Sequence, residues 1–316
     1  MKQKIKSFII IFILFIFILF IFNSGSKTSD VVIFSSNLFI KNVFPSLFPM
    51  FIISYMLVAV GFPSFLGDLF YKITTKLFKV KKEASFVFFM SMITGFPSSA
   101  KSINDLMDKN LINEDDASKI LMFTFFSNPL FIVNTVGVIF LNNIRYGYLI
   151  LIAHAFSNII LGLIFRNYKI SKDKSNVNIK NSLGMLNKNI NSINVFKVFF
   201  NGIKDGLNTL FVIYGIITTF LIIISLFNVN YDNVYISFLV GIFEMTSGLK
   251  FISLTNSSKL IKVLLSCFII SFGGFSVHTQ IMSVLSNKKI KYLPFFVARL
   301  LHALISVIIL FLILLF

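Results

Sequence analysis

The sequence has little of what soluble proteins carry in quantity. Only 13% of its residues are charged, and it contains one cysteine and no tryptophan, whereas soluble globular chains carry about 25% charged residues. The low charge, the hydrophobic fraction of 56% and the mean hydropathy of +0.89 exclude an ordinary soluble domain and indicate a polytopic membrane protein. The single cysteine, Cys267, lies in an apolar run, which excludes an intrachain disulfide and argues against a cysteine metal site.

The motifs of common enzyme classes are also absent. The chain has no His-Glu-x-x-His pair, no Walker loop and no Gly-x-Gly-x-x-Gly turn, and its three histidines are scattered. We therefore expect no enzyme, no metal and no organic cofactor. Acidic residues are scarce too, 12 against 29 Lys and Arg, for a formal net charge of +17. Because the lysines fall in loops between apolar segments, membrane topology explains them better than nucleic-acid binding does.

One stretch, from Met92 to Lys101, organises the first half of the chain. Its apolar approach, about 85–96, is too short to cross a bilayer, which takes roughly 20 apolar residues. It ends in Gly95-Phe96-Pro97-Ser98-Ser99-Ala100-Lys101. We expect a re-entrant hairpin here, since broken backbone at membrane depth is tolerated only inside protein or beside a wet cavity.

The other segments follow from apolar runs and charged loops. Residues 1–23 resemble a signal peptide but lack an A-x-A-like cleavage site, so we expect a retained N-terminal transmembrane helix, followed by an interfacial segment at 24–44. A first unit, 45–165, comprises a helix at 45–61, the hairpin 85–105, a broken helix 114–141 and a helix 147–165. A basic cytoplasmic linker, 166–197, precedes a second unit, 198–316, with a helix 207–227, a hairpin 234–252, a broken helix 260–285 and a helix 294–316.

The two units have the same parts in the same order. Ser127-Asn128-Pro129 interrupts one crossing, since proline lacks a backbone donor, and Ser271-Phe272-Gly273-Gly274 interrupts the other. A hairpin adds no net crossing, so each unit crosses three times and the second is inverted relative to the first. The expected fold class is an all-α polytopic membrane protein with inverted repeats, each with a re-entrant hairpin and a broken transmembrane helix. Such repeats are typical of secondary transporters, with the substrate site between the breaks.

The polar residues at these interruptions are candidate ligands for a solute. Hairpin tips and helix breaks leave backbone N–H groups and the positive ends of half-helices free, which suits a small anion. The alternatives are local capping for the hydroxyl residues and helix–helix hydrogen bonding for the others. The candidate substrate-binding residues are Ser98, Ser99, Asn128, Asn134, Thr246, Ser247, Ser276, His278 and Gln280.

Charged residues in the same region are candidates for pairing or coupling. Glu244 could bind a coupling proton or sodium ion, pair with Lys250 or Arg299, or cap a half-helix. Lys101 and Lys250 occupy equivalent positions and would neutralise a carboxylate substrate or extend to the interface. Arg299 would pair with Glu244 or the substrate, whereas packing or hydrogen bonding is expected of His154 and His302.

The basic loops set the orientation. The positive-inside rule assigns the loops at 72–82, 166–197 and 288–291 to the cytoplasm, which leaves the N-terminus inside and the C-terminus outside. The expected partners are the lipid bilayer and a small anionic substrate, with no nucleic acid, and the sequence leaves an oligomer open.

Four motifs together resemble one known family: Gly95–Lys101, Ser127–Phe131, Phe243–Gly248 and Gly273–Gln280. Over roughly residues 30–316 the chain resembles the YlbJ (SpoVV) sporulation integral membrane proteins, of the nucleoside-recognition "Gate" domain group, which is related in architecture to concentrative nucleoside transporters. The resemblance implies a protein of the outer forespore membrane of a spore-forming bacterium that moves dipicolinate out of the mother cell. The alternatives are a non-transporting component of spore-envelope assembly and a nucleoside transporter.

Overall fold

A computed structural model describes residues 25–170, 177–227 and 232–315, with seven residues between 11 and 22. The predicted helix at 1–23 lies outside these residues apart from those seven. Regular structure in the described part is helical throughout. In chain order the elements are α2 (Gly25–Leu38), η1 (Phe39–Val43), α3 (Phe44–Ala59), α4 (Phe62–Leu69), α5 (Tyr71–Phe78), α6 (Ala84–Thr94), α7 (Ser98–Asp108), α8 (Glu114–Phe123), η2 (Phe131–Phe140), α9 (Ile144–Ile164), η3 (Phe165–Asn167), α10 (Ile179–Ser192), α11 (Val195–Leu226), α12 (Val234–Phe243), α13 (Met245–Leu254), α14 (Lys259–Phe272), α15 (Gly274–Val284) and α16 (Tyr292–Leu315).

Several of the described helices are long and apolar enough to cross a membrane. Four meet this test alone, and a fifth crossing arises if a pair bent by 82° counts as one. They are Ile144–Asn167, Val195–Leu226, Lys259–Val284, Tyr292–Leu315 and the bent pair Leu47–Ala59 with Phe62–Leu69. The apolar helices α6, η2 and α12 have only 11, 10 and 10 residues, or about 15 Å of rise, half the hydrocarbon thickness. The expectation of an all-α membrane protein is confirmed.

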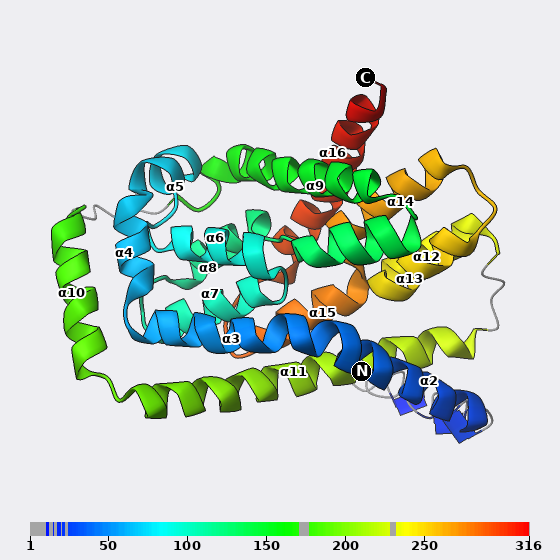
Figure 1. Ribbon diagram of the computed structural model, residues 1–316, viewed down its shortest axis with the longest axis horizontal. Helices are drawn as coiled ribbons and strands as arrows, with labels where there is room; N and C mark the ends of the chain where they lie inside the picture. The colour runs from blue at the N-terminus through cyan, green and yellow to red at the C-terminus, as the bar shows by residue number, and fades with distance from the viewer. Residues whose placement is uncertain are drawn as a thin grey trace, which may run out of the picture.

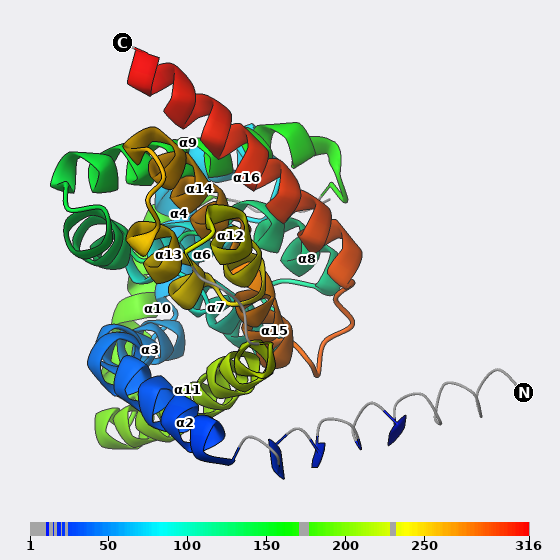
Figure 2. The ribbon, with the colours of Figure 1, turned by 90° about the vertical axis from the view of Figure 1, so that its right-hand side faces the viewer.

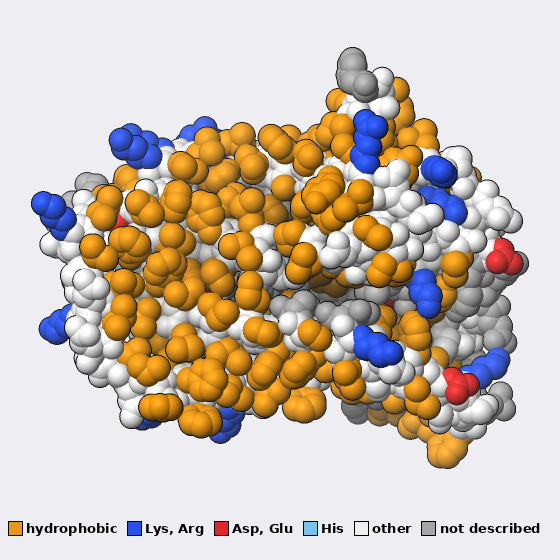
Figure 3. Space-filling model, viewed as in Figure 1, with side chains coloured by type: hydrophobic (Ala, Val, Ile, Leu, Met, Phe, Trp, Pro, Cys, Tyr) orange, Lys and Arg blue, Asp and Glu red, His pale blue; other side chains and the backbone are white. Residues whose placement is uncertain are grey.

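The helices form three tiers (Figures 1 and 2). On one side, α2, η1 and α3 run on as a single helix packed antiparallel to α11, and we call these four elements the scaffold. The short helices α6, α7, α12, α13 and α15 occupy the middle, and α9, α14 and α16 pack together on the other side. Lys and Arg side chains lie mainly toward the two ends of the molecule, and apolar side chains cover the face between them (Figure 3), as a bilayer-crossing body requires.

The segment expected at the membrane interface, 24–44, has a different form. Residues 25–43 make α2 and the π-helical turn η1 and continue into α3 without a break. Hydrogen bonds between Ser35 and Thr218 (2.5 Å) and between Ser36 and Tyr214 (2.7 Å) hold this extension on α11. These long-range contacts, absent from any local pattern, explain the difference.

The expected linker also contains more helix than its polar composition suggested. Its residues 171–176 lie outside the described part, but α10 occupies 179–192 and α11 begins at Val195 rather than at 207. Asn178 accepts the N–H of Asn181, and Asn194 accepts that of Lys197. Asn178 and Asn194, both within the expected linker, are thus helix N-caps.

The buried core is centred on the short helices. Phe125, just after α8, is fully buried and stacks on Phe96 with 4.4 Å between ring centroids, while its ring lies 5.8 Å from that of Phe295 in α16. One side chain thus joins the first hairpin tip, the end of α8 and α16. A separate cluster that includes Phe51 and Leu210 holds α3 on α11, so the scaffold has a core of its own.

Candidate functional site

The first helix break lies between α8 and η2. α8 ends at Phe123, residues 124–128 are not helical, and the helix resumes at Pro129. The Asn128 Oδ1 accepts the N–H of Leu130 (2.8 Å) and of Phe131 (3.4 Å). Since Pro129 has no N–H, the asparagine cap and the proline together account for the first donors of the new half-helix.

The first hairpin places its tip against this break. Gly95, between α6 and α7, has a φ of +81°, a region that only glycine adopts freely. The Phe96 N–H donates to the Phe126 carbonyl (2.6 Å), and a Cβ on Gly95 would lie 2.5 Å from the Asn128 nitrogen. The tip and the break are therefore in direct backbone contact, with no room for a larger residue.

The second hairpin reverses direction at Glu244. The backbones of α12 and α13 touch, since a Cβ on Gly248 would lie 2.0 Å from the Gly241 Cα. The Glu244 carboxylate accepts the N–H of Thr246 (3.1 Å) and of Ser247 (2.7 Å). Of the roles considered for Glu244, the structure contains the half-helix cap.

The second hairpin also packs on a helix break, between α14 and α15. Gly273 and Gly274 have φ values of +92° and +66°. A Cβ on Gly274 would lie 2.9 Å from the Gly241 carbonyl oxygen, and one on Gly273 would lie 2.4 Å from the Phe125 ring. This break thus contacts its own hairpin on one side and the first break on the other.

His154 of α9 ties the two breaks together. Its Nε2 accepts the Ser127 N–H (2.9 Å), and its Nδ1 hydrogen-bonds the Ser271 hydroxyl (3.0 Å). Because a backbone N–H only donates, Nε2 is unprotonated and Nδ1 carries the proton of a neutral imidazole. Ser127 and Ser271 begin the two matched break motifs, so one ring holds both breaks in register.

Arg299 and His302 of α16 extend this network. His302 Nε2 donates to the His154 carbonyl (2.9 Å), which leaves its Nδ1 to accept from Arg299 (2.8 Å). Arg299, fully buried, also donates to the Met122 carbonyl and lies 4.5 Å from the centre of the Phe125 ring, a cation–π contact. The guanidinium is held by α8 and α16.

A cavity of about 260 Å³ lies where the two hairpin tips, the first break, α15 and the scaffold meet. This is slightly below the range of about 300–1,000 Å³ for drug-sized ligands, so the cavity suits a small solute. Its lining residues are Leu38, Lys41, Val43, Leu47, Phe96, Pro97, Ser127, Asn128, Leu130, Phe131, Asn134, Thr135, Ile217, Glu244, Met245, Thr246, Val277 and Gln280.

Comparison with known proteins gives the family. The chain is 32% identical over 289 residues to the sporulation integral membrane protein YlbJ of Bacillus subtilis (strain 168). The alignment covers 82% of this chain and 71% of that protein. This chain belongs to the YlbJ family. The resemblance read from the four motifs is confirmed, and the chain is an integral membrane protein of sporulation. No family model and no solved structure matches it.

The site residues predicted for this YlbJ-family chain fall into two groups. Asn128, Asn134, Thr246 and Gln280 line the cavity, as does Glu244. Four predicted serines are buried outside its lining, and their hydroxyl oxygens have no hydrogen-bond partner within the described ranges: Ser98, Ser99, Ser247 and Ser276. A buried unpaired hydroxyl costs about 1–3 kcal/mol, so these groups are unusual for structural residues.

His278, which the sequence predicted as a substrate ligand, forms its hydrogen bonds with residues outside the cavity lining. Its Nε2 donates to the Phe272 carbonyl (2.8 Å), and its Nδ1 lies 2.9 Å from the Tyr292 hydroxyl. The Nδ1 therefore accepts the tyrosine proton. Both ring nitrogens have partners on α14 and α16, which fits the helix–helix role that the sequence left open.

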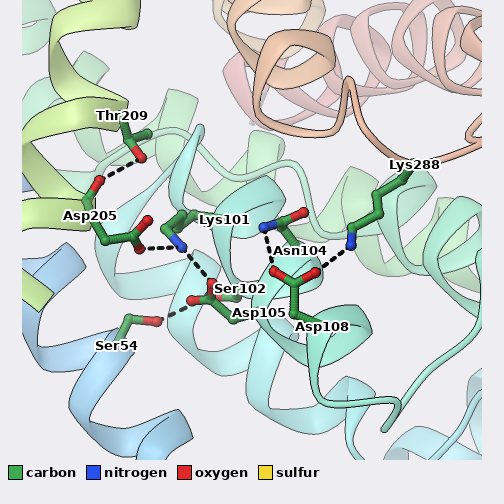
Figure 4. Close-up of polar contacts among 9 residues, drawn as sticks. All are labelled: Ser54, Lys101, Ser102, Asn104, Asp105, Asp108, Asp205, Thr209 and Lys288. Atoms are coloured by element: carbon green, nitrogen blue, oxygen red, sulfur yellow. Dashed lines mark hydrogen bonds and ion pairs between the residues drawn. The ribbon is translucent and has the colours of Figure 1, made fainter. Parts of the chain in front are cut away.

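The predicted cations do not line the cavity either. Lys101 pairs with Asp105 and Asp205 (Figure 4), and Lys250 is exposed, 5.2 Å from the Phe34 ring centre. The described ion pairs include none between Glu244 and Lys250 or Arg299.

A different lysine, Lys41 of η1, lines the cavity. Sequence reasoning missed it because residues 24–44 were assigned to the interface, away from the hairpins. The one signal for it was a lysine within the apolar run from Val31 to Phe44.

Proposed function

We propose that this YlbJ-family protein is a secondary transporter or facilitator of a small anionic solute, with dipicolinate as the substrate that the family resemblance implies. One observation carries the proposal: a single cavity is lined by the tips of both hairpins, by the first helix break and by α15, the half-helix that follows the second break. Interrupted helices inside a membrane are tolerated where they line a cavity, and paired interruptions around a central site are the architecture of secondary transporters.

The lining supports an anionic solute. Pro97 lines the cavity and precedes α7, which begins without a side-chain cap, so the positive end of the α7 dipole would attract a carboxylate there, although the Ser98 N–H already donates to the Gly95 carbonyl (3.1 Å). Lys41 adds a positive charge, and Asn128 and Asn134 add amide donors. Because Glu244 already neutralises the start of α13, the anion would lie toward α7 and Lys41.

The proposal includes the inverted repeat. Its support is that each half packs a hairpin tip on a helix break, at Gly95 against Asn128 and at Gly274 against Gly241. The hairpins and breaks would move against the scaffold, which has its own core. The N-terminus would be cytoplasmic, the C-terminus outside, and the membrane the outer forespore membrane. The proposal assigns no enzymatic activity and no nucleic-acid partner.

Uptake by purified protein in liposomes tests the proposal. Labelled dipicolinate should enter above the level of empty liposomes, and Asn134→Ala should reduce uptake about tenfold, as loss of one hydrogen bond to a charged ligand predicts. Asn181→Ala, exposed on α10, is the matched control and should leave uptake unchanged.

Two outcomes would contradict the proposal. Uptake of labelled uridine, with no uptake of dipicolinate, would favour a nucleoside transporter. Absence of any uptake by folded protein, combined with normal dipicolinate in spores that carry Asn128→Ala or Glu244→Ala, would favour a role in envelope assembly.

A further inference from the structure

A partly buried charge cluster joins the first hairpin to the scaffold (Figure 4). Lys101 of α7, 5% exposed, pairs with Asp105 on the next turn of α7 and with Asp205 of α11 at 2.5 Å. Beside it, the hydroxyls of Ser102 and of Ser54 in α3 lie 3.3 Å apart. The cluster therefore lies where the hairpin packs on α3 and where its Lys101 reaches α11.

The cluster holds one more acid than base. When all three groups are ionised, Lys101 balances only one of Asp105 and Asp205, and a net negative charge remains. Asp105 is 9% exposed, and its Oδ2 has no hydrogen-bond partner among the residues that the structure describes. A buried carboxylate that is incompletely paired is costly and favours its protonated form.

Neighbouring charges remove this excess only in part, because Lys109 attracts the Asp105 charge but forms no ion pair with it among the described residues. On α7, Asp108 pairs with Lys288 from the loop after α15 (Figure 4), and Lys109 donates to the Val58 carbonyl of α3 (2.5 Å). From α3, the Tyr55 ring centre lies 6.0 Å from Lys101 Nζ and adds no charge. The described ion pairs of the cluster include no residue of α6, α8 or α15.

These surroundings set the sign of the pH response. α7 is not one of the membrane-spanning helices, and burial raises the pKa of Asp105 to about 6, with Lys101 opposing the rise and Asp205 and Asp108 adding to it. A group that binds its proton more tightly when packed than when hydrated stabilises packing at low pH. That contribution is lost as the pH rises through about 6.

We propose that Lys101, Asp105 and Asp205 form a proton-binding site that couples the uptake of one proton to the docking of the first hairpin on α3 and α11. A proton from water converts the Asp105 carboxylate to the acid and leaves Lys101 and Asp205 as a neutral ion pair. Loss of the proton restores the net negative charge and favours hydration of the contact between α7 and α11. The proton has a route, because the Asp205 side chain is 40% exposed.

The second hairpin has no such site. Its equivalent lysine, Lys250, is exposed over the Phe34 ring and has no carboxylate among the described ion pairs. The cluster of one lysine and two aspartates therefore belongs to the first hairpin alone. Its effect on transport rests on the proposed function, whereas proton binding itself does not.

An infrared titration of the full chain in lipid nanodiscs tests the site. The C=O band of protonated carboxyls should titrate near pH 6 in the wild type. Asp105→Asn should remove this titration, Lys101→Gln should move it to higher pH, and Asp205→Asn should move it to lower pH. Asp115→Asn, at an exposed carboxylate paired with Lys169, is the matched control and should change nothing.

The same variants can also contradict the proposed proton site. A titration that persists in Asp105→Asn, or that moves in the same direction in Lys101→Gln and Asp205→Asn, overturns the proposal. Docking is measured independently by hydrogen exchange of α7, corrected for intrinsic rates. Above about pH 6, the α7 amides should be less protected in the wild type than in the Asp105→Asn protein. Equal protection of α7 in the two proteins at all pH values would overturn the coupling to docking.

Transport measurements separate this inference from the proposed function. In liposomes, an imposed pH gradient should change dipicolinate uptake by the wild type, and Asp105→Asn should abolish that response. Uptake that ignores the gradient overturns the coupling and leaves the transport proposal intact. If the expected carboxyl titration is seen in a protein that takes up no dipicolinate, the transport proposal is overturned and the proton site remains.

Discussion

At the scale of single residues, His154 joins the two helix breaks. Both of its ring nitrogens are engaged by groups that belong to different helix breaks, and its carbonyl holds His302. The ring is fully buried, and its one proton is fixed on Nδ1 by its partners. No other side chain type presents an acceptor and a donor at this separation on a rigid ring.

Replacement of His154 by Ala should destabilise the protein by about 2–4 kcal/mol, because it leaves the Ser127 N–H buried without an acceptor and opens a cavity. The midpoint of thermal unfolding in detergent measures the effect. Phe156→Ala, on the exposed face of the same helix, is the control and should cost far less. Equal losses in the two variants would show that the network does not hold the breaks.

Sequence reasoning could name these residues but not their partners. Packing or hydrogen bonding was expected for His154 and His302, whereas the groups that His154 holds lie 27 and 117 positions away in the chain. Lys101 is similar: Asp105 is four residues on and readable from helix periodicity, but Asp205 belongs to another helix. The roles of these residues are set by tertiary contacts, which the sequence alone does not show.

At the scale of elements, the hairpins depend on close backbone contact. Gly241 and Gly248 let α12 and α13 touch, as small residues do between membrane helices. The same two helices surround the break at Gly274. Any widening of this hairpin would therefore displace the second break as well.

Gly248→Ala should destabilise the protein by about 1–3 kcal/mol, since the added methyl would overlap the Gly241 backbone. The same substitution at Gly215 on α11, where a Cβ meets open space, should stabilise its helix by up to about 1 kcal/mol. Unfolding midpoints of the two variants should thus move in opposite directions. A stable Gly248→Ala protein would disprove the tight hairpin.

Element positions were predictable where the signal was local. The reversals at Gly95 and Glu244 and the interruptions at Pro129 and Gly273 follow from glycine, proline and short apolar runs. The continuity of α2 with α3 was not predictable, because a π-helical turn at 39–43 and contacts to α11 decide it. Because of this one difference, Lys41 was missing from the predicted site residues.

At the scale of the whole molecule, the arrangement of charge gives a test of orientation. α10 lies at one end of the body, beside α4 and α5, and the connection between α13 and α14 lies at the opposite end (Figure 1). If the basic linker is cytoplasmic, the first end faces inward and the second faces outward.

Single cysteines at these ends should label from opposite sides. Because the one native cysteine is buried, Cys267→Ser gives a background for Lys188→Cys on α10 and Asn256→Cys after α13, both at exposed positions. A membrane-impermeant maleimide should modify the Asn256→Cys protein in intact cells and the Lys188→Cys protein only after permeabilisation. The reverse pattern would invert the orientation. Labelling of both proteins in intact cells would place the two ends on the same side of the membrane. That result would contradict the inverted repeats.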